Sequence, residues 1–321
     1  MTDANSGLNR RDALALGLGA AGATGLAATA ATFGFDMQAL AQASKELQKR
    51  PIPHSGEMLP VVGIGTARIY DFPLTDSVRL AERAQVIKLM VQNGASLIDT
   101  APSYGEAEIV LGKLFELTKL RDKIFLATKV SVDDRDEQMK SMRESLKDMG
   151  VKQVQLMQLH NPKKPEQDID SIRAFQKEGL CKYIGISSSF DRDYKSVEAV
   201  LKREKPDFFQ IDYSMVDRNA EERLIPAARD VGAAVLTNLP FRRGKVFAQV
   251  KGKTLPDWAT KELGVTSWAQ FALKWLLGNP GVTAVIPGTD KPKYLIDNIR
   301  AGKGPMPDAA MRKKMVEVFD A

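Results

Sequence analysis

Four side chains suited to acid–base chemistry lie at or near the ends of apolar segments of this sequence. Asp99 ends the segment LID, and Tyr104 lies five residues further along, directly before a glycine. Lys129 lies near the end of IFLATKV, and His160 ends VQLMQLH. Each of them can instead have a purely structural role. Asp99, for example, can cap the next helix while Tyr104 packs on the turn. Four such residues on consecutive segments favour a shared chemical function.

Together these side chains can donate a proton to a carbonyl group. A phenol has a pKa of about 10, and a nearby ammonium group lowers it because the ammonium favours the phenolate. A carboxylate paired with the ammonium keeps it charged and in place. An imidazole beside the phenol can orient a carbonyl oxygen. The set contains neither a nucleophile nor a metal site, so we expect the reducing equivalent to come from a cofactor.

The elements that must position these residues follow a regular alternation. Short apolar segments suited to buried strands alternate with amphipathic segments such as RLAERAQVIKLMVQNG and EAEIVLGKLFELTK, several of which end in glycine. The apolar segments span residues 61–66, 96–99, 124–130, 154–160, 183–188, 208–214, 234–240 and 283–289. Eight strands with intervening helices over about 250 residues predict an α/β fold, the (β/α)₈ TIM barrel. In such a barrel the carboxyl ends of all strands share one face.

Two further features bear on this architecture. An open doubly wound sheet is the alternative, but it requires a glycine-rich phosphate turn after the first strand, and GIGTARIY is not G-x-G-x-x-G. Before the first barrel strand, IPHSGEMLP predicts a short hairpin with its turn at Ser55 and Gly56. We expect this hairpin to close the barrel floor and His54 within it to be structural.

Composition argues against several classes of protein and site. The chain has 321 residues, of which 44% are apolar and 27% charged, which is typical of a globular protein. The net charge of +6 is spread along the sequence, and no basic block is interleaved with aromatic residues, so nucleic-acid binding is not expected. The single cysteine, Cys181, excludes an intrachain disulfide. With one cysteine and two histidines, we expect no metal site rich in these residues.

The N-terminal segment differs from the rest of the chain. NRRDALALGLGAAGATGLAATAATFGF begins with paired arginines and has no charge from Ala13 to Phe35, and AQA at 41–43 provides the small residues that a signal peptidase requires. This pattern resembles a twin-arginine export signal; a membrane anchor or an unstructured tail is the alternative. We therefore expect a signal peptide over residues 1–43 and one barrel domain over 44–321. The expected location is periplasmic, or cytoplasmic if the signal is not functional.

Six segments resemble, in the same order, the sequence blocks of the aldo-keto reductase family. They are LIDTAPSYG, LATKV, LMQLHNP, KYIGISS, FFQIDYS and VIPGT, and the resemblance covers roughly residues 52–300. It implies a catalytic tetrad of Asp99, Tyr104, Lys129 and His160, with Tyr104 as the acid/base. It also implies a nicotinamide dinucleotide bound in extended form across the barrel mouth, without a Rossmann fold.

The resemblance further assigns residues to each part of the dinucleotide. Those matched to the nicotinamide and its carboxamide are Gly65, Thr66, Asp99, Ser187, Ser188, Gln210 and Asn238. Those matched to the pyrophosphate loop are Pro240, Phe241 and Arg243. Those matched to the adenosine phosphate and the adenosine are Pro287, Gly288, Thr289, Lys291, Asp297 and Asn298.

The chain departs from the family pattern at several of these positions. Ser187-Ser188 replaces the usual Ser-Asn, so a hydroxyl replaces one amide contact. Asn238 stands where an aromatic residue often stacks on the nicotinamide. Tyr294 and Gly288 stand in the places of an arginine and a lysine that commonly contact the 2′-phosphate.

Charges near these positions bear on the choice of cofactor. Lys291 and Lys293 lie in the same turn and can compensate as point charges, without the bidentate geometry of arginine. Asp290 adds a charge that repels phosphate. We therefore expect NADP(H) to be preferred over NAD(H), by a smaller margin than an arginine-bearing site gives.

The intact tetrad predicts an NAD(P)H-dependent reductase that transfers a hydride to the carbonyl of an aldehyde or ketone, with Tyr104 as proton donor. The alternative is an exported cofactor-binding redox sensor or binding module with vestigial turnover, which export favours because free NADPH is scarce outside the cytoplasm. The expected partners are a small carbonyl substrate and the export machinery, with no stable membrane insertion after cleavage. An exported protein is expected to carry its dinucleotide from the cytoplasm, because binding stabilises the folded state there.

Overall fold

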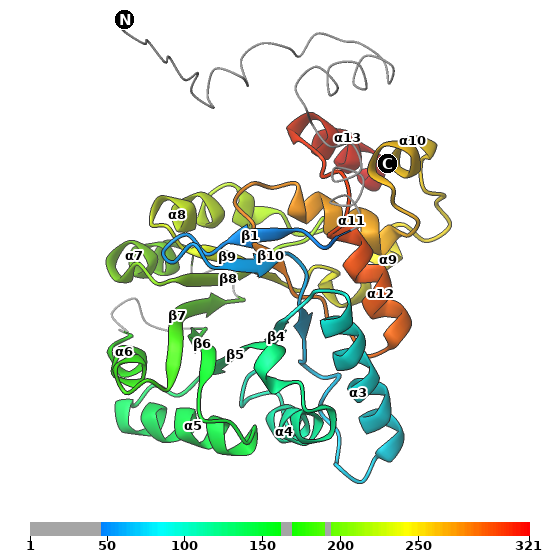
Figure 1. Ribbon diagram of the computed structural model, residues 1–321. Coiled ribbons are helices and arrows are strands. Elements are labelled where there is room, and N and C mark those ends of the chain that lie inside the picture. Colours follow the sequence, from blue (N-terminus) through cyan, green and yellow to red (C-terminus); the bar gives the residue numbers. More distant parts are fainter. Residues whose placement is uncertain (1–45, 162–168, 190–193) are drawn as a thin grey trace, which may run out of the picture. The chain divides into compact units, whose positions relative to one another are not determined.

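A computed structural model of the protein describes residues 46–161, 169–189 and 194–321 (Figure 1). These residues form one compact unit. The signal peptide predicted over residues 1–43 lies outside the described residues, as does its expected boundary with the barrel domain. Within the described ranges, no helix is both long enough and apolar enough to cross a membrane.

Eight parallel strands form the central sheet, and each pairs with the next along the chain. They are β3 (Ile64–Gly65), β4 (Leu97–Asp99), β5 (Phe125–Val130), β6 (Val154–His160), β7 (Cys181–Ser188), β8 (Phe208–Asp212), β9 (Ala234–Asn238) and β10 (Ala284–Val285). Parallel bridges from Val62 to Val285 and from Gly65 to Gly288 join the first strand to the last. The sheet therefore closes on itself, and the predicted (β/α)₈ TIM barrel is confirmed.

Helices connect the strands and lie outside the barrel (Figure 1). The α-helices are α3 (Ser77–Gln92), α4 (Ala107–Thr118), α5 (Arg135–Asp148), α6 (Asp170–Lys177), α7 (Tyr194–Glu204), α8 (Leu224–Asp230), α9 (Lys245–Gln249), α10 (Asp257–Leu263), α11 (Trp268–Leu277), α12 (Pro292–Ala301) and α13 (Ala309–Asp320). Short 3₁₀ turns are η2 (Arg121–Lys123), η4 (Asn219–Glu221) and η5 (Arg242–Gly244).

Local sequence signals set the limits of several helices. Asp134 caps α5, because its side chain accepts hydrogen bonds from the backbone N–H groups of Asp136 and Glu137 at 3.0 Å each. Gly94 and Gly150 follow α3 and α5 with φ angles of 80° and 62°. These are left-handed helix stops of the kind that the glycines at the ends of the amphipathic segments predict.

The barrel interior is apolar in its lower layer and polar towards the carboxyl ends of the strands. The buried lower layer is formed chiefly by Leu97, Phe125, Leu156, Tyr183, Phe208, Ala234, Leu236, Ala284 and Ile286. Side-chain direction alternates along a strand, so residues two or four positions further on face the same way. In β6 these residues are Gln158 and His160, and in β5 they are Ala127 and Lys129. The polar site thus lies directly above the apolar filling of the barrel.

The predicted N-terminal hairpin closes the floor of the barrel. β1 (Lys49–Pro51) pairs antiparallel with β2 (Met58–Pro60), and Gly56 in the turn between them has a φ of 73°. Ile52 and Leu59 from this hairpin are buried in the lower layer of the barrel interior. The hairpin therefore completes the apolar core at the end opposite to the site.

His54 has a structural role, as predicted from its place in the hairpin, and Cys181 has a structural role as well. His54 lies on the barrel floor, where Nδ1 is 3.2 Å from an Asp207 carboxylate oxygen and Nε2 is 3.1 Å from the Val231 carbonyl oxygen. Cys181 begins β7 and is buried, and burial raises the pKa of its thiol to about 12. Its reactive thiolate form is therefore not populated at neutral pH.

Candidate active site

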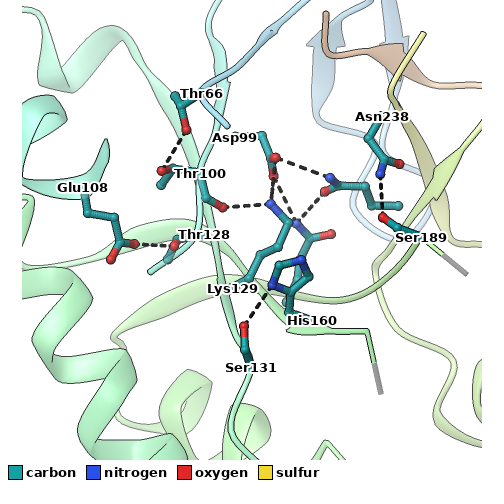
Figure 2. A network of polar contacts seen from close by, with 12 residues as sticks. Thr66, Asp99, Thr100, Glu108, Thr128, Lys129, Ser131, His160, Ser189 and Asn238 are labelled. Carbon is teal, nitrogen blue, oxygen red and sulfur yellow. Dashed lines mark hydrogen bonds and ion pairs between the residues drawn. The ribbon is translucent and has the colours of Figure 1, made fainter. Parts of the chain in front are cut away.

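A buried ion pair lies at the carboxyl ends of β4 and β5 (Figure 2). Lys129 Nζ is 2.7 Å from each carboxylate oxygen of Asp99 and 2.8 Å from the carbonyl oxygen of Thr100. Strand register places Asp99 opposite Ala127, two residues before Lys129 on the same strand face. The barrel interior therefore positions both partners before any ligand is present.

The surroundings of this pair favour its charged form. Burial opposes the charge on Lys129, but the attraction of Asp99 and Tyr104 outweighs it, and the pKa of Lys129 is raised. Burial also raises the pKa of Asp99, against the opposing effect of Lys129. Besides Lys129, the carboxylate is approached by the amide nitrogens of Gln158 at 3.4 Å and Gln210 at 3.3 Å. All these partners are donors, which suits an ionised carboxylate, so the ion pair is retained at neutral pH.

Tyr104 lies beside the ion pair, in the turn after β4. Lys129 Nζ is 5.1 Å from the centroid of the phenol ring and interacts with the hydroxyl group. Burial raises the pKa of Tyr104, and the opposing effect of Lys129 does not cancel this increase. The expectation of a lowered phenol pKa is therefore wrong for the protein on its own, because burial removes the solvation of the phenolate. The phenol is protonated at neutral pH.

The backbone next to Tyr104 is fixed by a contact with the loop after β3. Gly105 has a φ of 62°, and a Cβ atom at this position would lie 2.2 Å from a carboxylate oxygen of Asp71. The same carboxylate accepts a hydrogen bond from the backbone N–H of Glu106 at 3.1 Å, at the start of α4. The positive φ therefore favours glycine after Tyr104, and the Asp71 carboxylate anchors the turn that carries the phenol.

His160 ends β6 next to the phenol. The two ring centroids are 6.0 Å apart, with an angle of 87° between the ring planes. Nδ1 of His160 is 2.9 Å from Oγ of Ser131, which follows β5 (Figure 2). Burial and then the positive charge of Lys129 lower the pKa of His160 to about 3. The imidazole is therefore neutral at neutral pH.

Two buried amide side chains contact the ion pair from β6 and β8. Gln158 Nε2 donates a hydrogen bond to Gln210 Oε1 at 2.8 Å, and both side chains are fully buried. Oε1 of Gln158 is buried without a hydrogen-bond partner in the part of the chain that the structure describes. Gln158 was not predicted as a site residue, although the alternation that places His160 inward in VQLMQLH places Gln158 inward as well.

Three predicted site residues lie side by side across β6, β7 and β8. Strand register places Ser187 opposite His160 on one side and opposite Gln210 on the other. Ser187 and the following Ser188 are both buried. The hydroxyl and amide groups of this row can form hydrogen bonds with a carboxamide group.

Gly65 and Thr66 lie where the first and last strands of the barrel meet. A Cβ atom on Gly65 would lie 3.0 Å from the carbonyl oxygen of Ile286. Thr66 is fully buried, and its Oγ1 donates a hydrogen bond to Oγ1 of Thr100 at 2.9 Å (Figure 2). Its backbone N–H donates to the carbonyl oxygen of Asp99 at 3.0 Å. Both residues therefore shape the rim of the barrel next to the ion pair.

A second polar group lies at the ends of β8 and β9 and in the loops that follow them, and we call Asp212, Asp217, Asn238 and Arg242 the mouth cluster. Arg242 Nη1 is 2.5 Å from Asp212 Oδ2, and Arg242 Nη2 is 2.8 Å from Asp217 Oδ2. Asn238 Nδ2 donates to the other Asp212 oxygen at 2.5 Å and to Oγ of Ser189 at 3.1 Å. Burial raises the pKa of Asp212, against the effect of Arg242. The amide that replaces the expected stacking aromatic is thus part of a charged network.

Three members of the mouth cluster, Asp212, Asp217 and Arg242, were not predicted from the sequence. Asp212 follows the apolar run FFQI just as Asp99 follows LI, so the same signal was present. Arg242 gives no such signal, because its pairing depends on a loop in which Arg242 and Arg243 have φ angles of 44° and 54°. Consecutive positive φ angles outside glycine are not readable from sequence pattern.

The predicted pyrophosphate residues lie in the loop after β9. Phe241 packs on Phe247 with ring centroids 4.9 Å apart, and Pro240 before it is buried. Arg243 is exposed, in contrast to Arg242 next to it. The guanidinium of Arg243 is therefore accessible to an anion at the barrel mouth.

The predicted adenosine segment after β10 is bonded within itself. Thr289 Oγ1 donates to the Pro287 carbonyl oxygen at 2.9 Å and accepts from Asn298 Nδ2 at 3.0 Å. The Asp297 carboxylate accepts hydrogen bonds from the cap residue and the first turn of α11, at 2.7 and 2.6 Å. These polar side chains therefore hold the segment in place by contacts within the protein.

The exposed residues of this segment surround the start of α12. Gly288 and Lys291 are exposed, and α12 begins directly afterwards at Pro292. Lys293 Nζ lies 5.0 Å from the ring centroid of the exposed Tyr294. A helix N-terminus favours an anion, and the two lysines add positive charge around it.

Comparison with known proteins matches residues 61–314 to the Aldo/keto reductase family. The methylglyoxal reductase DkgB of Yersinia pestis is 30% identical over 255 residues, which cover 76% of this chain and 88% of that protein. Among solved structures, a thermostable aldo-keto reductase in complex with the inhibitor epalrestat is similar with a TM-score of 0.70 and 26% identity, over 84% of this chain and 99% of that chain. An aldo/keto reductase from Klebsiella pneumoniae in complex with NADP and acetate shares the fold, with a TM-score of 0.70 and 19% identity over 85% and 96% of the two chains.

Proposed function

Since this chain belongs to the aldo/keto reductase family and is an NAD(P)H-dependent oxidoreductase, we propose that it reduces the carbonyl of an aldehyde or ketone with Tyr104 as the proton donor. The observation that carries this proposal is the buried Asp99–Lys129 ion pair beside a protonated phenol. A proton donor must hold its proton before the reaction, and its conjugate base must be stabilised as it forms. Burial of Tyr104 supports the first requirement, and the charge of Lys129 supports the second.

Each member of the tetrad has a separate role in this proposal. Tyr104 donates its proton to the carbonyl oxygen, and the ammonium of Lys129 stabilises the phenolate that remains. Asp99 keeps Lys129 charged and fixes the position of its Nζ. The neutral His160 donates a hydrogen bond to the same carbonyl oxygen and orients it. The nicotinamide, when bound, supplies the hydride that accompanies this proton.

The residues at the barrel mouth fit a dinucleotide. Oε1 of Gln158 and Oδ1 of Asn238 are buried acceptors without partners among the described residues, and a carboxamide N–H is a donor of the kind they lack. Ser187 presents a hydroxyl in the same row. The exposed Arg243 and Lys291 supply positive charge for phosphate groups. We therefore assign the nicotinamide to the strand ends and the phosphates to the loops after β9 and β10.

We propose NADP(H) as the preferred cofactor. The exposed Lys291 and Lys293 and the N-terminus of α12 support binding of a 2′-phosphate. Tyr294 in place of an arginine, and the negative charge of Asp290, reduce the margin over NAD(H).

Replacing Tyr104 with phenylalanine tests the proposed reaction. The change removes only the hydroxyl group, so cofactor binding is expected to stay nearly unchanged while kcat falls by about 10²–10⁴-fold. Tyr70→Phe is the matched control, because its buried hydroxyl has no hydrogen-bond partner among the described residues. Oxidation of the reduced nicotinamide is followed by absorbance with a panel of aldehydes and ketones. A Tyr104→Phe variant with near wild-type kcat on a good substrate would show that Tyr104 is not the acid.

We also propose that residues 1–43 direct the folded protein through the twin-arginine route to the periplasm, with its dinucleotide bound. The paired arginines and the AQA site support this proposal. The test is to fractionate cells that express the wild type or a variant with Arg10 and Arg11 changed to lysine, and to assay dinucleotide in the periplasmic protein. Wild-type protein retained in the cytoplasm would contradict export. Bound dinucleotide without turnover of any carbonyl would favour the redox-sensor alternative.

A further inference from the structure

We propose that Ser131 is a positioning residue, whose hydroxyl donates a hydrogen bond to Nδ1 of His160 and so keeps the imidazole proton on Nε2. This inference rests on the proposed function, in which His160 must donate a hydrogen bond to the carbonyl oxygen of the substrate. Ser131 lies outside the tetrad and outside every position that the family resemblance assigns to the cofactor.

Strand pairing brings the two residues together. Val130 at the end of β5 lies opposite Leu159 of β6, so the next residues along the two strands, Ser131 and His160, are neighbours. Ser131 Oγ and His160 Nδ1 are 2.9 Å apart, a normal hydrogen-bond distance (Figure 2). The imidazole nitrogens lie on different sides of the ring, so Nε2 is directed away from Ser131.

The direction of this hydrogen bond follows from what each group needs. A neutral imidazole has one N–H, so one of its nitrogens donates and the other accepts. Ser131 is exposed, so water can donate to its oxygen while its hydroxyl hydrogen points to Nδ1. With the opposite arrangement, Nε2 would turn a lone pair towards the lone pairs of a carbonyl oxygen, which is repulsive. The donating hydroxyl is therefore the arrangement compatible with substrate binding.

The surroundings of His160 keep its ring neutral, so the tautomer decides whether the ring can donate a hydrogen bond to the substrate. The charges and rings near it are Lys129, which repels a second proton, and Tyr104, whose ring meets the imidazole edge to face. A doubly protonated ring would donate from both nitrogens and need no selection. Since burial and Lys129 keep the ring neutral, only the correct tautomer presents an N–H to the substrate. In the described residues, only Ser131 forms a hydrogen bond with the His160 ring.

The tautomer can be measured directly, because the chain has only two histidines. Heteronuclear NMR of the imidazole nitrogens distinguishes protonated from unprotonated nitrogen, and His54→Gln on the barrel floor assigns the remaining signals to His160. In the wild type we expect a protonated Nε2 and an unprotonated Nδ1. In Ser131→Ala we expect a mixture of tautomers, and in Ser131→Thr the wild-type pattern. A protonated Nδ1 in the wild type, or an unchanged pattern in Ser131→Ala, would overturn the proposal.

Kinetics provide the second readout. Loss of one hydrogen bond corresponds to a decrease of about 2–10-fold in kcat for Ser131→Ala, with Ser131→Thr recovering most of it and cofactor affinity unchanged. In a His160→Ala background, Ser131→Ala is expected to have no further effect, because the residue acts through His160. A decrease of equal size in both backgrounds would show a general structural role and contradict the inference. The NMR result needs no turnover, so failure of the proposed reaction and failure of this inference are distinguishable.

Discussion

The two sides of the barrel mouth are positioned in different ways. On one side, Asp99, Lys129 and His160 extend from paired strands directly above the apolar filling of the barrel. On the other side, the mouth cluster joins Asp212 at the end of β8 to Arg242 in a loop with positive φ angles. Strand register positions all three residues of the first side, whereas on the second side it positions Asp212 and Asn238, and ion pairs attach Arg242 from the loop.

This difference has consequences for substitution. Strand register holds the backbone of Asp99, Lys129 and His160 in place, so a substitution at one of them is expected to remove chemistry while the neighbouring atoms keep their positions. The loop after β9 is attached to the strand ends by the ion pairs of Arg242, so removal of these pairs is expected to make the loop more mobile. We therefore expect tetrad variants to lower kcat and mouth-cluster variants to weaken cofactor binding.

Among the variants that test this comparison, the largest effect is expected for Lys129→Met. Without the ammonium, the phenolate of Tyr104 is not stabilised, and kcat is expected to fall by at least about 10²–10³-fold. Asp99 is then a buried carboxylate without a counter-charge, which costs about 3–5 kcal/mol in the free energy of unfolding. Steady-state kinetics and urea denaturation measure the two effects.

A double variant separates stability from catalysis at this ion pair. Asp99→Asn combined with Lys129→Met removes both charges with little change in volume, so the free energy of unfolding is expected to recover towards the wild-type value. Activity is expected to stay as low as in Lys129→Met. Recovery of activity together with stability would show that the ion pair contributes to folding alone.

A smaller effect, on binding, is expected for Arg242→Ala. The change leaves Asp212 and Asp217 without their cation and releases the loop after β9, so the cofactor is expected to dissociate about tenfold faster, as for the loss of one charge-assisted contact. Because the tetrad is untouched, kcat at saturating cofactor is expected to change little. Stopped-flow fluorescence measures dissociation, and Arg242→Lys, which keeps the charge without the planar fork, is expected to be intermediate. An unchanged dissociation rate together with a reduced kcat would contradict this prediction, because it would show that Arg242 supports catalysis and not cofactor binding.

The smallest effect is expected for Tyr294→Arg. An arginine at this exposed position adds a bidentate partner for a 2′-phosphate, so the ratio of NADPH to NADH affinity is expected to rise about fivefold above that of the wild type. NADH affinity is expected to stay nearly constant, which serves as the internal control. Side-by-side titrations of both cofactors measure the ratio. A wild type that already prefers NADPH a thousandfold, or that prefers NADH, would contradict the proposed modest margin.

The sequence by itself determined the order of the barrel strands and the convergence of the four candidate acid–base residues. Alternation of apolar and amphipathic segments specifies the (β/α)₈ order, and this order alone brings Asp99, Lys129 and His160 to one face. The alternation in β6 also places Gln158 inward, although its position within an apolar run gives no separate signal. Ser131 could also be predicted to lie near the site, since it is the first residue after the strand that carries Lys129.

Only the tertiary structure decided the electrostatics and the mouth cluster. From the sequence, Lys129 was expected to lower the pKa of Tyr104, but the raised pKa depends on how completely the surrounding chain excludes water. The pairing of Arg242 with Asp212 depends on a left-handed loop backbone, for which arginine has no intrinsic preference. Burial and loop conformation are sums over many distant contacts, whereas strand order and side-chain alternation are local properties of the sequence. For this reason the sequence identifies the candidate acid–base residues, while the protonation state of the phenol and the network around Asn238 are properties of the folded molecule.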